Sequence, residues 1–137
     1  MQLELSKRVS AQLVTESFIK TIFSALQRYV KIPDSYDFIS VDVVGDTSMQ
    51  ALNKTYRQQN YIPDVLSFPY GPEGGEIVLC YPQAKRQAKA KQVPLRSELA
   101  WLLIHGFLHI LGYDHEQATA AKIMRPLEQR ILQAIKL

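Results

Sequence analysis

The three histidines of the chain lie close together, in the segment HGFLHILGYDH at positions 105–115. On a helix, His105 and His109 project from the same face, one turn apart. Two imidazoles so placed can bind one metal ion through nitrogens at ~2.0–2.1 Å. Gly112 tolerates the left-handed conformation that ends helices, so the chain can reverse there and return His115 as a third ligand. Three protein ligands leave one coordination position open for water, which is typical of a catalytic site.

The alternative for each histidine is an ordinary packed core residue, but three at this spacing favour a metal site. Imidazole nitrogens suit zinc or another late first-row ion, and we expect one ion per chain. The spacing also matches the HExxHxxGxxH motif of metalloproteases, except that Gly106 replaces the glutamate that acts as base. Gly106 either permits tight packing against a neighbouring element or leaves room for substrate. In both cases a peptidase lacks its general base.

A phosphodiester substrate fits this residue set better than a peptide. A metal ion alone can lower the pKa of bound water to ~7, so a glutamate base is less necessary. Phosphoryl transfer needs cationic stabilisation of the phosphate oxygens, and the planar fork of arginine matches them. An arginine is therefore expected near the metal.

Two segments resemble the YbeY family of bacterial metal-dependent endoribonucleases. HGFLHILGYDH resembles that family's HGxLHLxGYDH signature, and LNKTYRQQNYIPDVLSFP resembles its LNxxYRxxDxPTDVLSFP segment. The strand-like EIVLC and the segment SELAWLLIHG also resemble the family, so that the likeness covers roughly residues 40–130. The departures are Asn60, Ile62-Pro63 and Glu76, which affect the loop before residues 64–68 and leave the histidines untouched.

The resemblance implies a zincin-like α+β fold, with a small mixed sheet against helices and the metal-binding helix near the C-terminus. It implies zinc-dependent cleavage of single-stranded RNA, maturation of the 3′ end of 16S ribosomal RNA, ribosome quality control, and contact with the ribosome or its proteins. It assigns zinc binding to His105, His109 and His115, and catalysis to Arg57. The other interpretation of Arg57 is a helix-end residue that interacts with terminal carbonyls.

Several further residues have two interpretations each. Asp64 and Asp114 could orient a ligand imidazole or make local hydrogen bonds. The basic stretch of residues 85–96 could follow an RNA backbone or form a solvated helix face. Four aromatic residues could stack unpaired bases: Tyr61, Phe68, Tyr70 and Tyr113. The alternative for Phe68 is a place in the core, and the alternative for Tyr113 is packing beside the metal.

Composition limits the class of protein. The length of 137 residues predicts one domain over residues 1–137. The net charge of +3 permits nucleic-acid binding. The single cysteine, Cys80, cannot form an internal disulfide and is expected to be a buried, inert thiol. No apolar run approaches the ~20 residues of a membrane span, and the N-terminus shows no secretory signal, so we expect a cytoplasmic protein without membrane contact.

Hydrophobic periodicity predicts the elements that must position these residues. Helices are expected at 15–31, 82–92, 96–110 and 119–135, the last with a kink or restart at Pro126. A further helix, indicated by Met49, Leu52 and Tyr56, is expected to end at about residue 57. Strands are expected near residue 3 and at 37–44, 64–68 and 76–81. The order lacks strict alternation of strand and helix, which favours an α+β fold.

Two other functions remain open at this point. One is a metallopeptidase or another metal-dependent hydrolase of a small substrate. The other is a non-enzymatic ribosome assembly factor in which zinc is structural.

Overall fold

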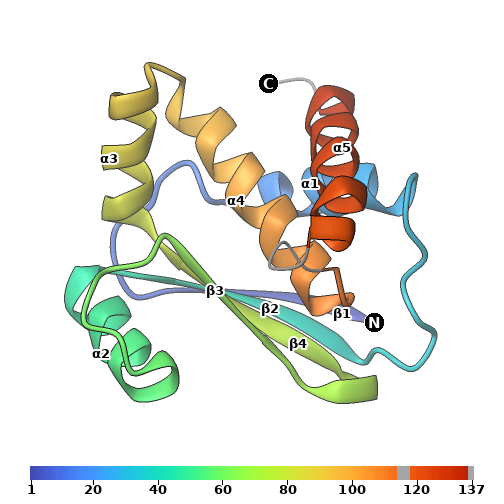
Figure 1. Cartoon of the computed structure of the whole chain (residues 1–137), viewed down its shortest axis with the longest axis horizontal. Coiled ribbons are helices and arrows are strands. Elements are labelled where there is room, and N and C mark those ends of the chain that lie inside the picture. Colours follow the sequence, from blue (N-terminus) through green and yellow to red (C-terminus); the bar gives the residue numbers. More distant parts are fainter. Residues whose placement is uncertain (114–117, 136–137) are drawn as a thin grey trace.

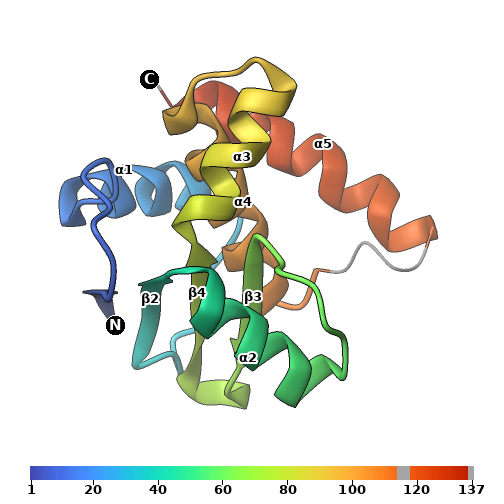
Figure 2. The same cartoon turned by 90° about the vertical axis from the view of Figure 1, so that its left-hand side faces the viewer.

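A mixed sheet forms the centre of the computed structural model, which describes residues 1–113 and 118–135. Its four strands are ordered β1-β2-β4-β3, with β1, β2 and β4 parallel and β3 antiparallel to β4. The bounds are β1 (Gln2–Lys7), β2 (Phe38–Val44), β3 (Val65–Pro69) and β4 (Gly74–Cys80). The predicted small mixed sheet is confirmed, and β3 forms the edge opposite β1 (Figure 2).

Five helices cover the two faces of this sheet. They are α1 (Glu16–Gln27), α2 (Asp46–Arg57), α3 (Tyr81–Lys91), α4 (Leu95–Ile110) and α5 (Ala118–Ala134), with a short 3₁₀ turn, η1 (Gly71–Glu73), before β4. Helix α2 lies on one face, and the other four helices lie on the opposite face (Figure 1). None of the helices in the described ranges is long and apolar enough to cross a bilayer.

The alternation of β2 shows how the sequence sets these two faces. Ile39, Val41 and Val43 are fully buried and join the main core with α1 and α4. Ser40 and Asp42 point to the opposite face and are only half-buried. Successive strand residues point to opposite faces, so the polar members of β2 lie on the side of α2.

Helix α4 is the central helix of the molecule and contacts α1, α3, α5, β3 and β4. Most of its residues are buried, because it is apolar on nearly all sides. Phe107 of α4 packs against Phe23 of α1, with ring centroids 5.4 Å apart. Because five elements pack against it, α4 is a rigid support for the side chains it carries.

Two helix predictions differ from the structure. The helix expected over residues 15–31 ends at Gln27. Val30 lies in the turn that follows and is still buried, which explains why the apolar pattern extends past the helix. Of the kink or restart expected at Pro126, the restart is wrong, because one helix continues through the proline. Burial of Met124 and Ile131 on either side of Pro126 stabilises the helix despite the lost backbone hydrogen bond.

Candidate metal centre and phosphate site

His105 and His109 form a pair on consecutive turns of α4. Their ring centroids lie 4.4 Å apart with an interplanar angle of 49°, and both side chains are half-buried. The predicted same-face arrangement of these two histidines is therefore confirmed. His115 and Asp114, by contrast, lie outside the described residues, so the role of His115 as a third ligand stays a prediction.

Gly112 ends α4 in the conformation expected from the sequence. Its φ is +99°, its N–H bonds to the His109 carbonyl at 3.1 Å, and the Tyr113 N–H bonds to the Leu108 carbonyl at 3.0 Å. These two bonds are those of a Schellman motif, in which glycine avoids the strain that a side chain would cause. The chain therefore turns away from the helix axis three residues after His109.

Glu128 of α5 contacts the first histidine of the pair. Its Oε1 lies 2.8 Å from His105 Nδ1, and Glu128 is only 3% exposed. An ionised carboxylate can only accept hydrogen bonds, so this contact favours the tautomer in which Nδ1 carries the proton. In that tautomer Nε2 is the ring nitrogen that would bind a metal ion.

Sequence reasoning missed Glu128. The signal was present, because Met124 and Ile131 of α5 and Ile135 just beyond it are buried at helical spacing, and Glu128 falls on the same stripe. An acidic residue on an apolar helix face needs a buried partner. His105, 23 residues earlier, is that partner, and sequence separation hid the pairing.

Arg57 and the two histidines line one cavity of about 690 Å³ at the β3 edge of the sheet. Arg57 is the last residue of α2, and its side chain is exposed. The remaining lining residues are Tyr56, Val65, Leu66, Ser67 and Phe68. Residues 48 positions apart in sequence thus line one cavity, and a cation shares that cavity with two imidazoles that could hold a metal.

Gly106 has a packing role. A Cβ at this position would lie 3.0 Å from Ile77 Cγ2 of β4, closer than ordinary van der Waals contact. The Ser67 hydroxyl donates to the Gly106 carbonyl at 3.2 Å, which joins α4 to the edge strand β3. A glutamate here, as in the metalloprotease motif, would require the Ile77 side chain to move.

The histidine pair fits a metal ion in donor type, and Glu128 supplies the outer carboxylate that histidine ligands commonly contact. Within the described ranges, no group of three or more His, Cys, Asp or Glu side chains could hold a metal ion. A complete ligand set therefore requires a donor beyond those residues, and His115 is the predicted one.

Asp64 and Cys80 have local structural roles. The Asp64 carboxylate accepts from the Val65 N–H at 2.7 Å, at the start of β3. Cys80 is fully buried, as expected, and burial raises the pKa of its thiol to about 11. A thiol with so high a pKa stays protonated and unreactive near neutral pH.

Two members of the basic stretch make intramolecular ion pairs. Arg86 donates to both oxygens of Asp46, at 2.6 and 3.0 Å. Lys91 donates to both oxygens of the buried Glu98, at 3.0 and 3.1 Å, and lies 4.2 Å from the Trp101 ring centroid. These two cations support α3, which favours the interpretation of this stretch as a structural helix face.

The aromatic residues divide into separate groups. Phe68 and Tyr70 lie on the α2 face of the sheet, and Tyr70 is 47% exposed. Tyr61 is exposed in the loop before β3, where its carbonyl accepts from Asn53. Tyr113 packs against the main core beside the end of α4.

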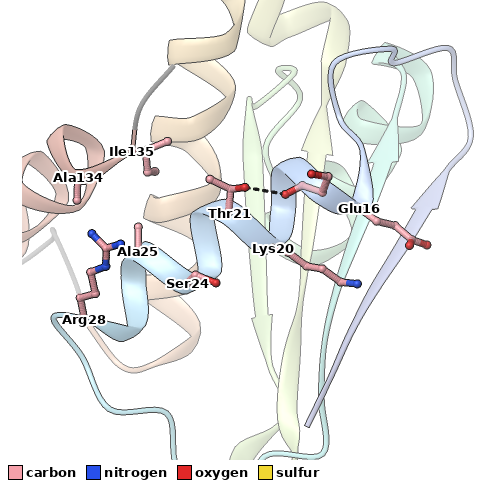
Figure 3. A pocket seen from close by; sticks show the side chains of 9 residues that line it. Glu16, Lys20, Thr21, Ser24, Ala25, Arg28, Ala134 and Ile135 are labelled. Atoms are coloured by element: carbon pink, nitrogen blue, oxygen red, sulfur yellow. Dashed lines mark hydrogen bonds between the residues drawn. The ribbon is translucent and has the colours of Figure 1, made fainter.

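Another hollow, of about 590 Å³, lies along α1 and the end of α5 (Figure 3). Charged side chains such as Glu16, Lys20 and Arg28 line it, and the Thr21 hydroxyl donates to the Ser17 carbonyl within the same helix. Neither histidine of the pair reaches this hollow. Its mixed charges and small side chains indicate a solvated helix surface.

The sheet, the central helix and its histidine pair together define a zincin-like α+β domain with a candidate metal centre. Residues 3–136 match the protein family described as Endoribonuclease YbeY, and the chain belongs to the YbeY family.

Relatives and a solved structure agree with this assignment. The chain is 44% identical over 115 residues to an Endoribonuclease YbeY of Thermodesulfovibrio yellowstonii, covering 78% of this chain and 72% of that one. It is 32% identical to an Endoribonuclease YbeY of Alkaliphilus oremlandii, covering 100% of this chain and 99% of the relative. The solution structure of TM1509 from Thermotoga maritima has the same fold, with a TM-score of 0.71 at 23% identity, covering 98% of this chain and 89% of that one.

Proposed function

We propose that this chain is a zinc-dependent endoribonuclease that cleaves single-stranded RNA. The observation that carries this proposal is the cavity shared by Arg57, His105 and His109. Membership of the YbeY family, whose relatives are named as endoribonucleases, supports RNA as the substrate.

Arg57 binds the phosphate in this proposal. Its guanidinium is permanently charged and exposed at the cavity opening, so it can make paired hydrogen bonds to phosphate oxygens. Negative charge on these oxygens increases during phosphoryl transfer, and a fixed cation stabilises the transition state more than the ground state.

His105, His109 and His115 would hold the zinc ion, with Glu128 fixing the ring of His105. A zinc ion at this place supplies Lewis acidity, which stabilises phosphoryl oxygens and lowers the pKa of water. Among the described residues, no carboxylate lines the cavity, so none is available there as a glutamate-type base. This chemistry suits a phosphodiester better than a peptide.

The natural substrate we propose is ribosomal RNA, with cleavage at the 3′ end of the 16S molecule in the cytoplasm. The support is the resemblance of the histidine and arginine segments to the YbeY family. Contact with the ribosome or ribosomal proteins, and a role in ribosome quality control, belong to the same proposal.

The test is Arg57→Ala in zinc-loaded protein, assayed on single-stranded RNA. We expect cleavage to fall by roughly 10²–10³-fold, the usual loss when one transition-state donor is removed. Lys54→Ala is the matched control, because Lys54 is exposed in the same last turn of α2 and does not line the cavity. Zinc content and thermal stability should be unchanged in both variants.

Full RNA cleavage by a folded, zinc-loaded Arg57→Ala protein would exclude the proposed role of Arg57. Peptide cleavage without RNA cleavage by the unsubstituted protein would indicate a metallopeptidase. No cleavage of either substrate, with zinc needed only for folding, would indicate an assembly factor.

A further inference from the structure

A second cavity, of about 550 Å³, adjoins the histidine cavity on the α2 face of the sheet, and we call it the tyrosine cavity. Tyr56 and Phe68 line both cavities and form a shared wall, with ring centroids 5.2 Å apart at 65°. The other lining residues are Arg8, Asp42, Ser48, Ala51, Leu52, Thr55, Tyr70, Glu76 and Val78. A strand of RNA at Arg57 would therefore lie directly beside this cavity.

Its aromatic rings are exposed but held in place. Tyr56 is 64% exposed and Tyr70 is 47% exposed. The Tyr70 hydroxyl donates to Glu76 at 2.7 Å, and its ring lies 5.9 Å from that of Phe38. Rings that are fixed by neighbours and open to solvent can stack on unpaired bases without first being ordered.

The charge of the tyrosine cavity disfavours phosphate. Asp42 of β2 and Glu76 of β4 are carboxylates on neighbouring strands, and both line this cavity. Arg8 Nε lies 3.6 Å from Asp42 Oδ2, but the Arg8 side chain is 68% exposed, so solvent screens its positive charge. Phosphate is repelled by two carboxylates and attracted by Arg57 in the neighbouring cavity, so a nucleotide would place its phosphate there and its neutral base here.

The same carboxylates provide a basis for selecting the base. Adenine and cytosine carry exocyclic amino groups that can donate to a carboxylate, whereas the corresponding group of uracil is a carbonyl acceptor. A uracil carbonyl facing Asp42 or Glu76 would place acceptor against acceptor.

We propose that the tyrosine cavity binds one unpaired nucleobase of the RNA, stacked on Tyr56 or Tyr70, and that it prefers bases with an exocyclic amino group. This inference rests on the proposed function only for the identity of the ligand as RNA. It adds a base subsite and a base preference to the cleavage site.

The experiment measures binding without cleavage. Full-length protein stripped of metal with EDTA is titrated against fluorescein-labelled single-stranded oligomers of adenosine, cytidine or uridine, with anisotropy as the readout. We expect Tyr56→Ala and Tyr70→Ala each to weaken binding of the adenosine and cytidine oligomers by roughly 5- to 150-fold, the range for loss of one base–aromatic stack. Tyr29→Ala is the control, because Tyr29 is 43% exposed and lines neither cavity.

The base preference has its own variant. Unsubstituted protein should bind the adenosine and cytidine oligomers more tightly than the uridine oligomer. Glu76→Gln should narrow that difference, because the amide offers a donor to the uracil carbonyl while its oxygen can still accept from Tyr70. Equal binding of all three oligomers by the unsubstituted protein would overturn the preference.

The outcomes separate this inference from the proposed function. If both tyrosine variants stay folded by circular dichroism and bind RNA like the unsubstituted protein, the base subsite is wrong, whether or not zinc-loaded protein cleaves RNA. If the variants lose binding but zinc-loaded protein cleaves no RNA, the subsite stands and the nuclease proposal fails.

Discussion

Glu128 of α5 lies with its Oε1 2.8 Å from Nδ1 of His105 on α4, which joins the last helix to the candidate metal centre. Metal-binding histidines usually donate their second ring N–H to such an acceptor, and loss of the acceptor typically costs 10–100-fold in metal affinity. We therefore expect Glu128→Ala to weaken zinc binding by about that factor. Glu128→Gln should weaken it less, because the amide oxygen can still accept from Nδ1.

Chelator competition measures this affinity in purified protein. Gln129→Ala is the control, because Gln129 is the exposed neighbour of Glu128 on α5. His109→Ala provides the reference for loss of a ligand. Because truncating a buried carboxylate can also loosen α5, ¹⁵N NMR of the His105 ring gives a second readout, and an unchanged tautomer together with unchanged affinity would contradict the positioning role.

Gly106 sets the distance between α4 and the sheet, so larger side chains there should destabilise the protein. We expect Gly106→Glu to lower the free energy of unfolding by at least about 1–3 kcal/mol, the usual cost of overpacking a core. Thermal and urea unfolding would measure the change. Ile123→Glu, at a 59% exposed helix position, controls for a new carboxylate, and a stable Gly106→Glu protein with peptidase activity would reverse our interpretation of this glycine.

The sequence predicted the parts of this structure that depend on local pattern. The His105–His109 pair follows from helical spacing, and the end of α4 follows from the conformational freedom of Gly112. The alternation of β2 likewise identified its buried residues in advance. Each of these features is determined within about a dozen residues.

Features that depend on tertiary packing were not predictable in the same way. The pairing of Glu128 with His105 and the contact of Gly106 with Ile77 join elements far apart in sequence. The placement of Arg57 beside the histidines came from a family resemblance, because no local pattern links the end of α2 to α4. Apolar periodicity also misplaced the end of α1, since Val30 is buried without being helical.

The Arg86–Asp46 pair predicts a pH-dependent contribution to stability. Hydrogen bonds from Arg86 hold the pKa of Asp46 below its ordinary value, so the stabilisation is present above an unfolded pKa of about 3.9 and is lost as the pH falls through the folded pKa. Arg86→Ala should reduce the free energy of unfolding at pH 7 by at most about 1 kcal/mol, because solvent screens exposed pairs.

Urea unfolding of Arg86→Ala at a series of pH values measures this effect, with Lys89→Ala as the control on the same helix. The difference from unsubstituted protein should shrink toward zero in acid. A difference that stays constant down to pH values below the folded pKa would show that Arg86 acts through packing rather than through the charge of Asp46.

The pKa of Asp42 shifts in the opposite direction to that of Asp46, because burial raises it despite the nearby Arg8. The unfolded chain then ionises at lower pH than the folded protein, so ionisation of Asp42 destabilises the fold as the pH rises. Asp42→Asn should therefore increase the free energy of unfolding at pH 7, and the gain should disappear below the unfolded pKa. Asp34→Asn, at an exposed position, controls for the change in net charge.

A carboxylate that costs stability at neutral pH is expected where function needs it, so Asp42→Asn should also reduce the preference of the tyrosine cavity for adenosine and cytidine over uridine. A stabilised protein with an unchanged base preference would separate the two effects and remove Asp42 from the base subsite.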